Sequence, residues 1–242
     1  MSTDISPNQA RGRSDLTLGI VRRLIQLGVQ ALLLAAILFI SSGSLDWMWA
    51  WIYIGSFVVG VGINGFVLYR KNPALIAERA QVGEGTKGWD RALTLVYGLL
   101  ASVILQLVAG LDRRFGWSPP LPAGVHLTGL VLSLLGFAFA SWAMIENAYF
   151  ACTVRIQGER GHTVCSSGPY RYVRHPGYTG WALGLLTTPL LLGSLWALVP
   201  GGLAVCLLII RSALEDRALQ AELDGYKSYA QRVRYRLVPG IW

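Results

Sequence analysis

Long apolar blocks separated by short polar segments dominate the sequence. Four of these blocks cover about residues 24–42, 47–69, 92–111 and 125–149. A helix of roughly 18 or more apolar residues can cross the hydrocarbon core of a bilayer, which is about 30 Å thick. The pattern therefore predicts an all-α, polytopic integral membrane protein in which residues 19–150 form four transmembrane helices.

The last third of the chain follows a different pattern. Two shorter apolar blocks, 178–192 and 195–210, are separated by Gly193 and Ser194. Each is too short to be an ordinary independent span, so we predict a helical hairpin that crosses the bilayer fully or only in part. The total is then about five to six transmembrane helices. The second arm is expected to continue out of the membrane from Arg211, whereas the polar residues 1–18 read as a disordered tail without a cleavable signal peptide.

The placement of basic residues predicts the orientation. Only 14% of the residues are charged, against roughly 25% in soluble domains. Of the 21 Lys and Arg residues, 19 fall in segments that share one side, and only Arg113 and Arg114 fall on the other. Basic residues are enriched in cytoplasmic loops, so we expect both termini in the cytoplasm. The net charge of +8 then reflects topology and does not indicate nucleic-acid binding.

Two other classes of site find little support. The three cysteines and three histidines show neither CxxC nor HExxH spacing, so no metal site is expected. Residues 60–65 match GxGxxG, but they lie inside an apolar block without the βαβ context that dinucleotide binding requires. We interpret these glycines as small residues that allow close helix packing.

The composition changes abruptly at residue 151. The following segment combines arginine, histidine and tyrosine with Gly-Pro and Pro-Gly pairs that predict turns. A loop that only sets topology needs basic residues but has no use for the others. A helix is expected to begin at Pro176, and its first amides favour an anionic group. We therefore predict that chemistry resides in 151–242, beginning with His162 to Tyr178.

Polar residues near the predicted membrane surface allow two interpretations. Arg211 and Glu215 lie one helical turn apart, so they can form an intrahelical salt bridge or hold the two charges of a zwitterionic ligand. Glu146 and Asn147 end the fourth block. A carboxylate there can be functional or can extend to the interface.

At these residues the sequence resembles the isoprenylcysteine carboxyl methyltransferases and their bacterial relatives; phospholipid N-methyltransferases share a looser form. The resemblance rests on His162-x-Val-Cys-Ser-Ser-Gly-Pro-Tyr-Arg-Tyr-Val-Arg-His-Pro-Gly-Tyr-x-Gly180 and on Arg211-x3-Glu215-Asp216-x2-Leu219. It covers about residues 147–239. It implies a membrane methyltransferase, in a bacterial cytoplasmic membrane, that binds S-adenosyl-L-methionine in a cytosol-facing pocket.

The resemblance also implies roles for individual residues. The cofactor residues would be Gln157, His162, Thr163, Val164, Cys165, Tyr170, His175, Pro176, Gly177, Tyr178 and Glu215. The catalytic residues would be Arg211, His175 and Glu215, and the acceptor would contact Arg211, Arg174, Glu146 and Asn147. Asp216 and Gly177 depart from the commonest family residues, and Gln157 lies closer to the first histidine than is usual in the eukaryotic enzymes.

Several functions remain open at this point. A carboxylate acceptor is already ionised at neutral pH and needs no base, which favours O-methylation of a lipid-like carboxylate entering from the bilayer. An amine acceptor, as in phospholipid N-methylation, would need deprotonation by His175 or Glu146. An NADPH-dependent reductase of the sterol type and a non-enzymatic membrane assembly factor are the remaining alternatives.

Overall fold

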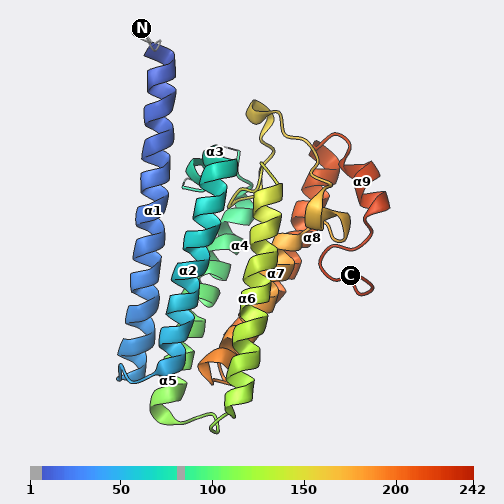
Figure 1. The fold of residues 1–242 in the computed structure, drawn as a ribbon. Coiled ribbons are helices and arrows are strands. Elements are labelled where there is room, and N and C mark those ends of the chain that lie inside the picture. Colours follow the sequence, from blue (N-terminus) through green and yellow to red (C-terminus); the bar gives the residue numbers. More distant parts are fainter. Residues whose placement is uncertain (1–6, 81–84) are drawn as a thin grey trace.

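The computed structural model describes the backbone of residues 7–80 and 85–242, and the side chains from residue 16 onward. Within these residues the chain forms helices and no strand, which confirms the all-α prediction. The long helices run side by side, whereas two short helices, α3 (Pro73–Glu78) and α9 (Tyr226–Arg232), and the loop 147–175 gather toward the end of the bundle that holds the N-terminus (Figure 1).

The first half of the chain supplies four long apolar helical stretches. They are α1 (Pro7–Ser42), α2 (Met48–Lys71), the continuous stretch of α4 (Gly88–Leu99), η1 (Leu100–Ile104) and α5 (Leu105–Phe115), and α6 (Ala123–Glu146). Each contains a segment long and apolar enough to cross a membrane. Large apolar side chains face outward, for example Ile40 with 75% and Leu95 with 74% of its surface exposed. Only a lipid environment would cover such surfaces, so this is a membrane protein.

Helix α7 (Pro176–Leu192) and helix α8 (Leu198–Glu222) form the predicted hairpin. Only α8 is long enough to count as a fifth candidate span. Gly193 ends α7 with a positive φ of 79°, a conformation in which glycine carries no steric penalty. Helix α8 continues past Arg211, as expected, and a short helix, α9 (Tyr226–Arg232), follows it.

Two details differ from the prediction. Helix α1 begins at Pro7, so residues 7–18 extend the first span as a helix where a disordered tail was expected; residues 1–6 lie outside the described part. The polar segment between the second and third spans also contains a short helix, α3 (Pro73–Glu78), with the Asn72 side chain accepting a hydrogen bond from the amide of Leu75. Pro73 at the first helical position suits this start.

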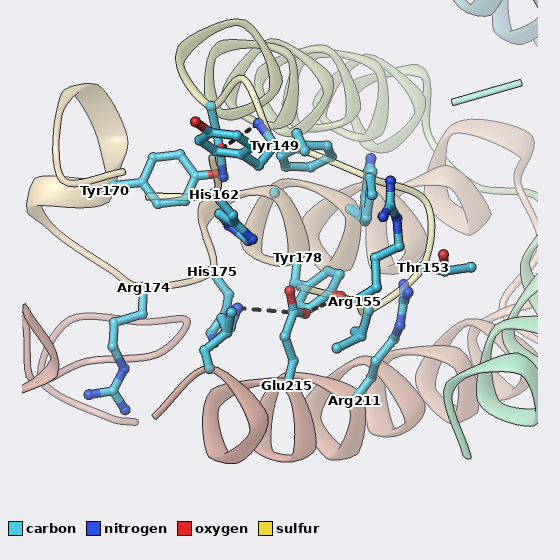
Figure 2. A pocket seen from close by; sticks show the side chains of 17 residues that line it. Tyr149, Thr153, Arg155, His162, Tyr170, Arg174, His175, Tyr178, Arg211 and Glu215 are labelled. Atoms are coloured by element: carbon cyan, nitrogen blue, oxygen red, sulfur yellow. Dashed lines mark hydrogen bonds and ion pairs between the residues drawn. The ribbon is translucent and has the colours of Figure 1, made fainter. Parts of the chain in front are cut away.

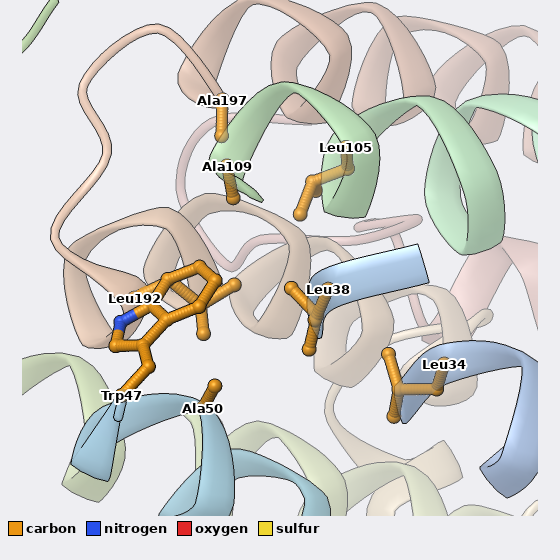
Figure 3. Close-up of a cluster of buried hydrophobic side chains, with 8 residues drawn as sticks. All are labelled: Leu34, Leu38, Trp47, Ala50, Leu105, Ala109, Leu192 and Ala197. Carbon is orange, nitrogen blue, oxygen red and sulfur yellow. The ribbon is translucent and has the colours of Figure 1, made fainter. Parts of the chain in front are cut away.

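Close helix contacts depend on glycine. A Cβ on Gly180 of α7 would lie 2.3 Å from the carbonyl oxygen of Gly136 in α6, so the two backbones touch. Gly60, in the GxGxxG segment, faces the ring of Phe137, as expected for a packing role. At the opposite end of the bundle from the N-terminus, a buried cluster joins α1, α2, α5 and the α7–α8 turn (Figure 3). It holds α7 in place, and α7 begins at the candidate site.

Candidate active site

A cleft opens where the loop after α6 meets the start of α7 and the middle of α8 (Figure 2). Its cavity has a volume of about 100 Å³ and is open to solvent on one side. Pockets for small ligands typically measure about 300–1,000 Å³. The enclosed part of the cleft is therefore smaller than a typical ligand pocket.

Many of the predicted site residues meet in this cleft. Those that line it are Asn147, His162, Tyr170, Arg174, His175, Gly177, Tyr178, Arg211 and Glu215. Predicted residues that lie outside its lining are Glu146, Gln157, Thr163, Val164, Cys165 and Pro176. The chain thus brings its polar motif and α8 together, although they lie more than thirty residues apart in sequence.

Glu215 is the only carboxylate among the described residues that line the cleft. The hydroxyl group of Tyr178 donates a hydrogen bond to its Oε2 over 2.5 Å. His175 Nδ1 lies 3.9 Å from the same oxygen, and the His175 ring stacks on Tyr178 at 5.6 Å between centroids. A negative charge with aromatic faces beside it is suited to binding an organic cation.

Arg211 is fully engaged by a residue that sequence analysis missed. Its Nε lies 2.7 Å from Oδ1 of Asp90 in α4, and its Nη2 donates to Asp90 Oδ2 at 3.1 Å and to the carbonyl of Cys152 at 2.8 Å. Asp90 is completely buried and also accepts a hydrogen bond from the amide of Val154. Of the two interpretations left open by the sequence, the Arg211–Glu215 salt bridge is not formed, because Arg211 instead pairs with Asp90 and fastens α8 to α4 and to the loop.

Asp216 organises the other side of α8. This buried carboxylate lies 2.8 Å from Nε of Arg174 and 3.2 Å from Nε of Arg236, and it accepts a hydrogen bond from Tyr226. His175 Nε2 is buried 3.6 Å away without a hydrogen-bond partner. In the sequence, Asp216 was notable only because a glutamate is more common at this position in the family that the chain resembles. The structure gives it a role in fixing Arg174 and the C-terminal segment.

Gln157 does not line the cleft but holds the loop around it through hydrogen bonds to Tyr149, Arg160 and His162. The buried Gln157 side chain donates to the carbonyl of Tyr149 at 2.8 Å and accepts from Arg160. Its backbone amide donates to Nδ1 of His162, whose ring lies 4.5 Å from that of Tyr149. Burial, helped by the charges of Arg160 and Arg155, lowers the pKa of His162, so the ring is neutral at pH 7.

Residues 163–165 and Tyr170 belong to the same loop. Val164 and Cys165 pack on an apolar cluster that includes Tyr226 and Tyr229. Tyr170 is buried, which holds its pKa well above 10, and its hydroxyl group accepts a hydrogen bond from Asn147. The phenol therefore stays neutral and presents a fixed ring to the cleft.

Two aromatic residues form one wall of the cleft. Trp181 and Phe150 both line it, with their rings edge to face at 5.7 Å. A Cβ on Gly177 would lie 2.6 Å from the Phe150 ring, so the glycine that departs from the family's commoner residue makes room for Phe150. Neither Phe150 nor Trp181 was predicted, because an aromatic residue in or next to an apolar block carries no distinguishing local signal.

Comparison with known proteins associates this region with one family. Residues 129–221 match the sequence pattern of the isoprenylcysteine carboxyl methyltransferase (ICMT) family. Over 134 residues the chain is 31% identical to the cobalt-zinc-cadmium resistance protein CzcN of Cupriavidus metallidurans, covering 54% of this chain and 56% of that protein. Over 73 residues it is 36% identical to a probable protein-S-isoprenylcysteine O-methyltransferase of Oryza sativa subsp. japonica, covering 27% and 38%.

The chain thus spans about half the length, or less, of these curated relatives. Among solved structures, the eukaryotic intramembrane Ras methyltransferase ICMT aligns with 94% of this chain and 97% of its own, at 15% identity and a TM-score of 0.44.

Proposed function

We propose that this membrane protein, whose residues 129–221 match the isoprenylcysteine carboxyl methyltransferase family, transfers a methyl group from S-adenosyl-L-methionine to a lipid-like acceptor. The observation that carries the proposal is the convergence of Glu215, Tyr178 and His175 in a cleft between the polar motif and α8. Family members are methyltransferases, and the residues here fit the charge pattern of that cofactor.

Each part of the cofactor has a candidate partner in the cleft. Glu215, with Tyr178 beside it, would hold the positively charged part of the cofactor. Tyr149 and His162 present adjacent rings for the adenine. The first turn of α7 points its partial positive charge at the cleft, where the methionine carboxylate would lie. When bound, the cofactor would supply an electrophilic methyl group for in-line displacement.

The protein's own contribution is then mainly orientation. Holding donor and acceptor in line can remove a large part of the barrier, on the order of 7–11 kcal/mol in well-oriented systems. An acceptor carboxylate needs no base, because it is ionised at neutral pH. We therefore favour O-methylation of a lipid carboxylate, with the cleft and both termini on the cytoplasmic side as the basic residues predict.

Calorimetric titration of the purified, detergent-solubilised protein with S-adenosyl-L-methionine tests cofactor binding. Glu215→Gln removes the cleft's carboxylate charge and should weaken binding about tenfold or more, because a hydrogen bond or contact to a charged group contributes about 1.5–3 kcal/mol. Glu222→Gln is the matched control, since Glu222 lies on the same helix but pairs with Lys87 at the surface. Absence of binding at millimolar cofactor by folded wild-type protein would refute the proposal.

The type of linkage can be read from the product. A methyl ester releases methanol in base, whereas an N-methyl group does not. Transfer of tritiated methyl followed by alkaline hydrolysis should therefore yield volatile label. Label that stays with the lipid after this treatment would assign the protein to amine methylation.

A further inference from the structure

Residues 226–242, which comprise α9 and the chain after it, combine positive charge with exposure. They contain Lys227, Arg232, Arg234 and Arg236 and no acidic residue. Arg236 is bound by the buried Asp216. The other three basic side chains are exposed and form no salt bridge with any residue that the structure describes. We call residues 226–242 the basic segment. Nothing in the described part of the chain pairs with these three charges.

The basic segment also exposes large apolar side chains. Tyr235, Val238 and Ile241 have 39%, 41% and 80% of their surface exposed. The amide of Leu237 donates a hydrogen bond to the backbone oxygen of Trp242 at 3.1 Å, so the chain folds back on itself. Val238 and Ile241 lie in the turn between these two residues. Exposed apolar side chains among unpaired basic ones are typical of a segment that lies in the plane of a membrane surface.

The end of the basic segment lies beside the apolar helices. Figure 1 shows the chain returning from α9 along the side of the bundle. Leu237 is buried in a cluster with Tyr178 of α7 and Leu208 of α8, and Trp242 packs against the same cluster. Leu208 belongs to a stretch of α8 that is long and apolar enough to cross a membrane. The exposed turn is therefore held next to the bilayer.

Backbone hydrogen bonds join the basic segment to two residues that line the cleft. The amide of Arg174 donates to the carbonyl of Tyr235 at 3.0 Å, and the amide of His175 donates to the carbonyl of Arg236 at 2.9 Å. The guanidinium of Arg236 lies 3.2 Å from the carboxylate of Asp216, which also pairs with Arg174. A partner that holds the basic segment in place therefore also holds this edge of the cleft.

We propose that the basic segment binds anionic phospholipid at the bilayer surface, and that this contact orders the backbone of Arg174 and His175 at the cleft. Each Lys or Arg close to an anionic surface strengthens attachment about fivefold, and the side chains of Val238 and Ile241 enter the boundary between head groups and acyl chains. An acidic soluble protein matches the charges, but the apolar turn lies beside the spans, where lipid is the neighbour. The consequence for cofactor affinity rests on the proposed function, whereas the ordering of the backbone does not.

Hydrogen exchange of the purified full chain in lipid nanodiscs tests the proposal. Discs of pure phosphatidylcholine are compared with discs that contain about 30% phosphatidylglycerol. Exchange is read by mass spectrometry in peptides that contain Arg174 and His175, whose amides donate to the basic segment. Phosphatidylglycerol should slow exchange at these amides by about fivefold or more, the effect of one basic residue at an anionic surface.

Two double variants separate the basic segment from other positive charges. Arg232→Gln/Arg234→Gln removes two exposed charges that lie outside the cleft, and it should abolish the difference between the two kinds of disc. Arg70→Gln/Lys71→Gln is the matched control, because it removes two exposed charges from the last turn of α2. This control should show the wild-type difference.

Three results would overturn the lipid contact. They are equal exchange in the two kinds of disc, an equal loss of protection in both double variants, and protection by soluble polyglutamate in phosphatidylcholine discs that matches the effect of phosphatidylglycerol. The last would identify a surface for an acidic protein. Titration of the same discs with S-adenosyl-L-methionine separates this inference from the proposed function. Lipid-dependent protection without cofactor binding would defeat only the proposed function, and cofactor binding with lipid-independent exchange would defeat only the lipid contact.

Discussion

At the scale of single residues, Asp90 is the position on which the site depends most. It is completely buried, pairs with Arg211 through both carboxylate oxygens and accepts the amide of Val154. Asp90→Asn leaves a buried cation without its partner, and breaking such a pair costs about 3–5 kcal/mol. We expect a large fall in the unfolding temperature in detergent, measured by scanning fluorimetry.

Two controls separate this effect from a general loss of charge. Lys87→Ala removes the exposed pair with Glu222 and should cost less than about 1 kcal/mol. The double variant Asp90→Leu/Arg211→Met replaces both charges with apolar groups and should be more stable than Asp90→Asn alone. If Asp90→Asn unfolds at the wild-type temperature, the pair does not hold α8 to α4.

His162 gives the protein a predictable response to pH. Burial, with the charges of Arg160 and Arg155, lowers the pKa of His162 below its ordinary value of 6.5. The unfolded chain therefore takes up this proton at a higher pH than the folded chain, so acidification through pH 6.5 favours unfolding. The unfolding temperature should fall from pH 7.5 to pH 6, and it should fall less in His162→Gln. Identical pH dependence in the two proteins would contradict this assignment.

At the scale of elements, the packing of α6 on α7 positions the motif. Because the Gly180 and Gly136 backbones touch, Gly180→Ala places a methyl group 2.3 Å from a carbonyl oxygen and must push the helices apart. Gly184→Ala is a matched control one turn away, since a Cβ there meets no other atom within 4 Å. We expect Gly180→Ala to lower the unfolding temperature and cofactor affinity. Gly184→Ala should be neutral or slightly stabilising, by about 0.5–1 kcal/mol.

Equal behaviour of the two alanine variants would show that α6 and α7 are not locked together at this contact. The same comparison explains what the sequence could predict about elements. Apolar runs are local, so the spans and the hairpin could be predicted. The close approach at Gly180 depends on which helices become neighbours, and nothing in the local pattern specifies this.

The residues of the candidate site also include some that could be predicted from the sequence and some that could not. Glu215, Tyr178 and His175 belong to motifs whose spacing is readable, and the structure brings them together. Asp90 is a single acidic residue 121 positions from Arg211, without a pattern that would associate them. Residues 7–18 were expected to be disordered because they are polar. They instead form the first part of helix α1, whose later residues are apolar. Such long-range effects come from tertiary structure and are not visible in local composition.

At the scale of the whole molecule, the fold places the candidate site toward one end of a bundle of apolar helices. The polar motif, α3 and the N-terminus of α1 lie toward the same end of the bundle (Figure 1), and the long apolar helices extend away from that end. A membrane enzyme that combines a polar cofactor with an apolar acceptor needs this arrangement.

The most direct test of the central claim is methyl transfer by the purified protein in vesicles. The protein is incubated with methyl-tritiated S-adenosyl-L-methionine and a membrane lipid extract, and label in the organic phase is counted. We predict cofactor- and protein-dependent labelling of a lipid that is retained in Glu222→Gln and lost or reduced at least tenfold in Glu215→Gln. Equal labelling by wild type and Glu215→Gln, or no labelled lipid from a folded wild-type sample that binds the cofactor, would contradict it.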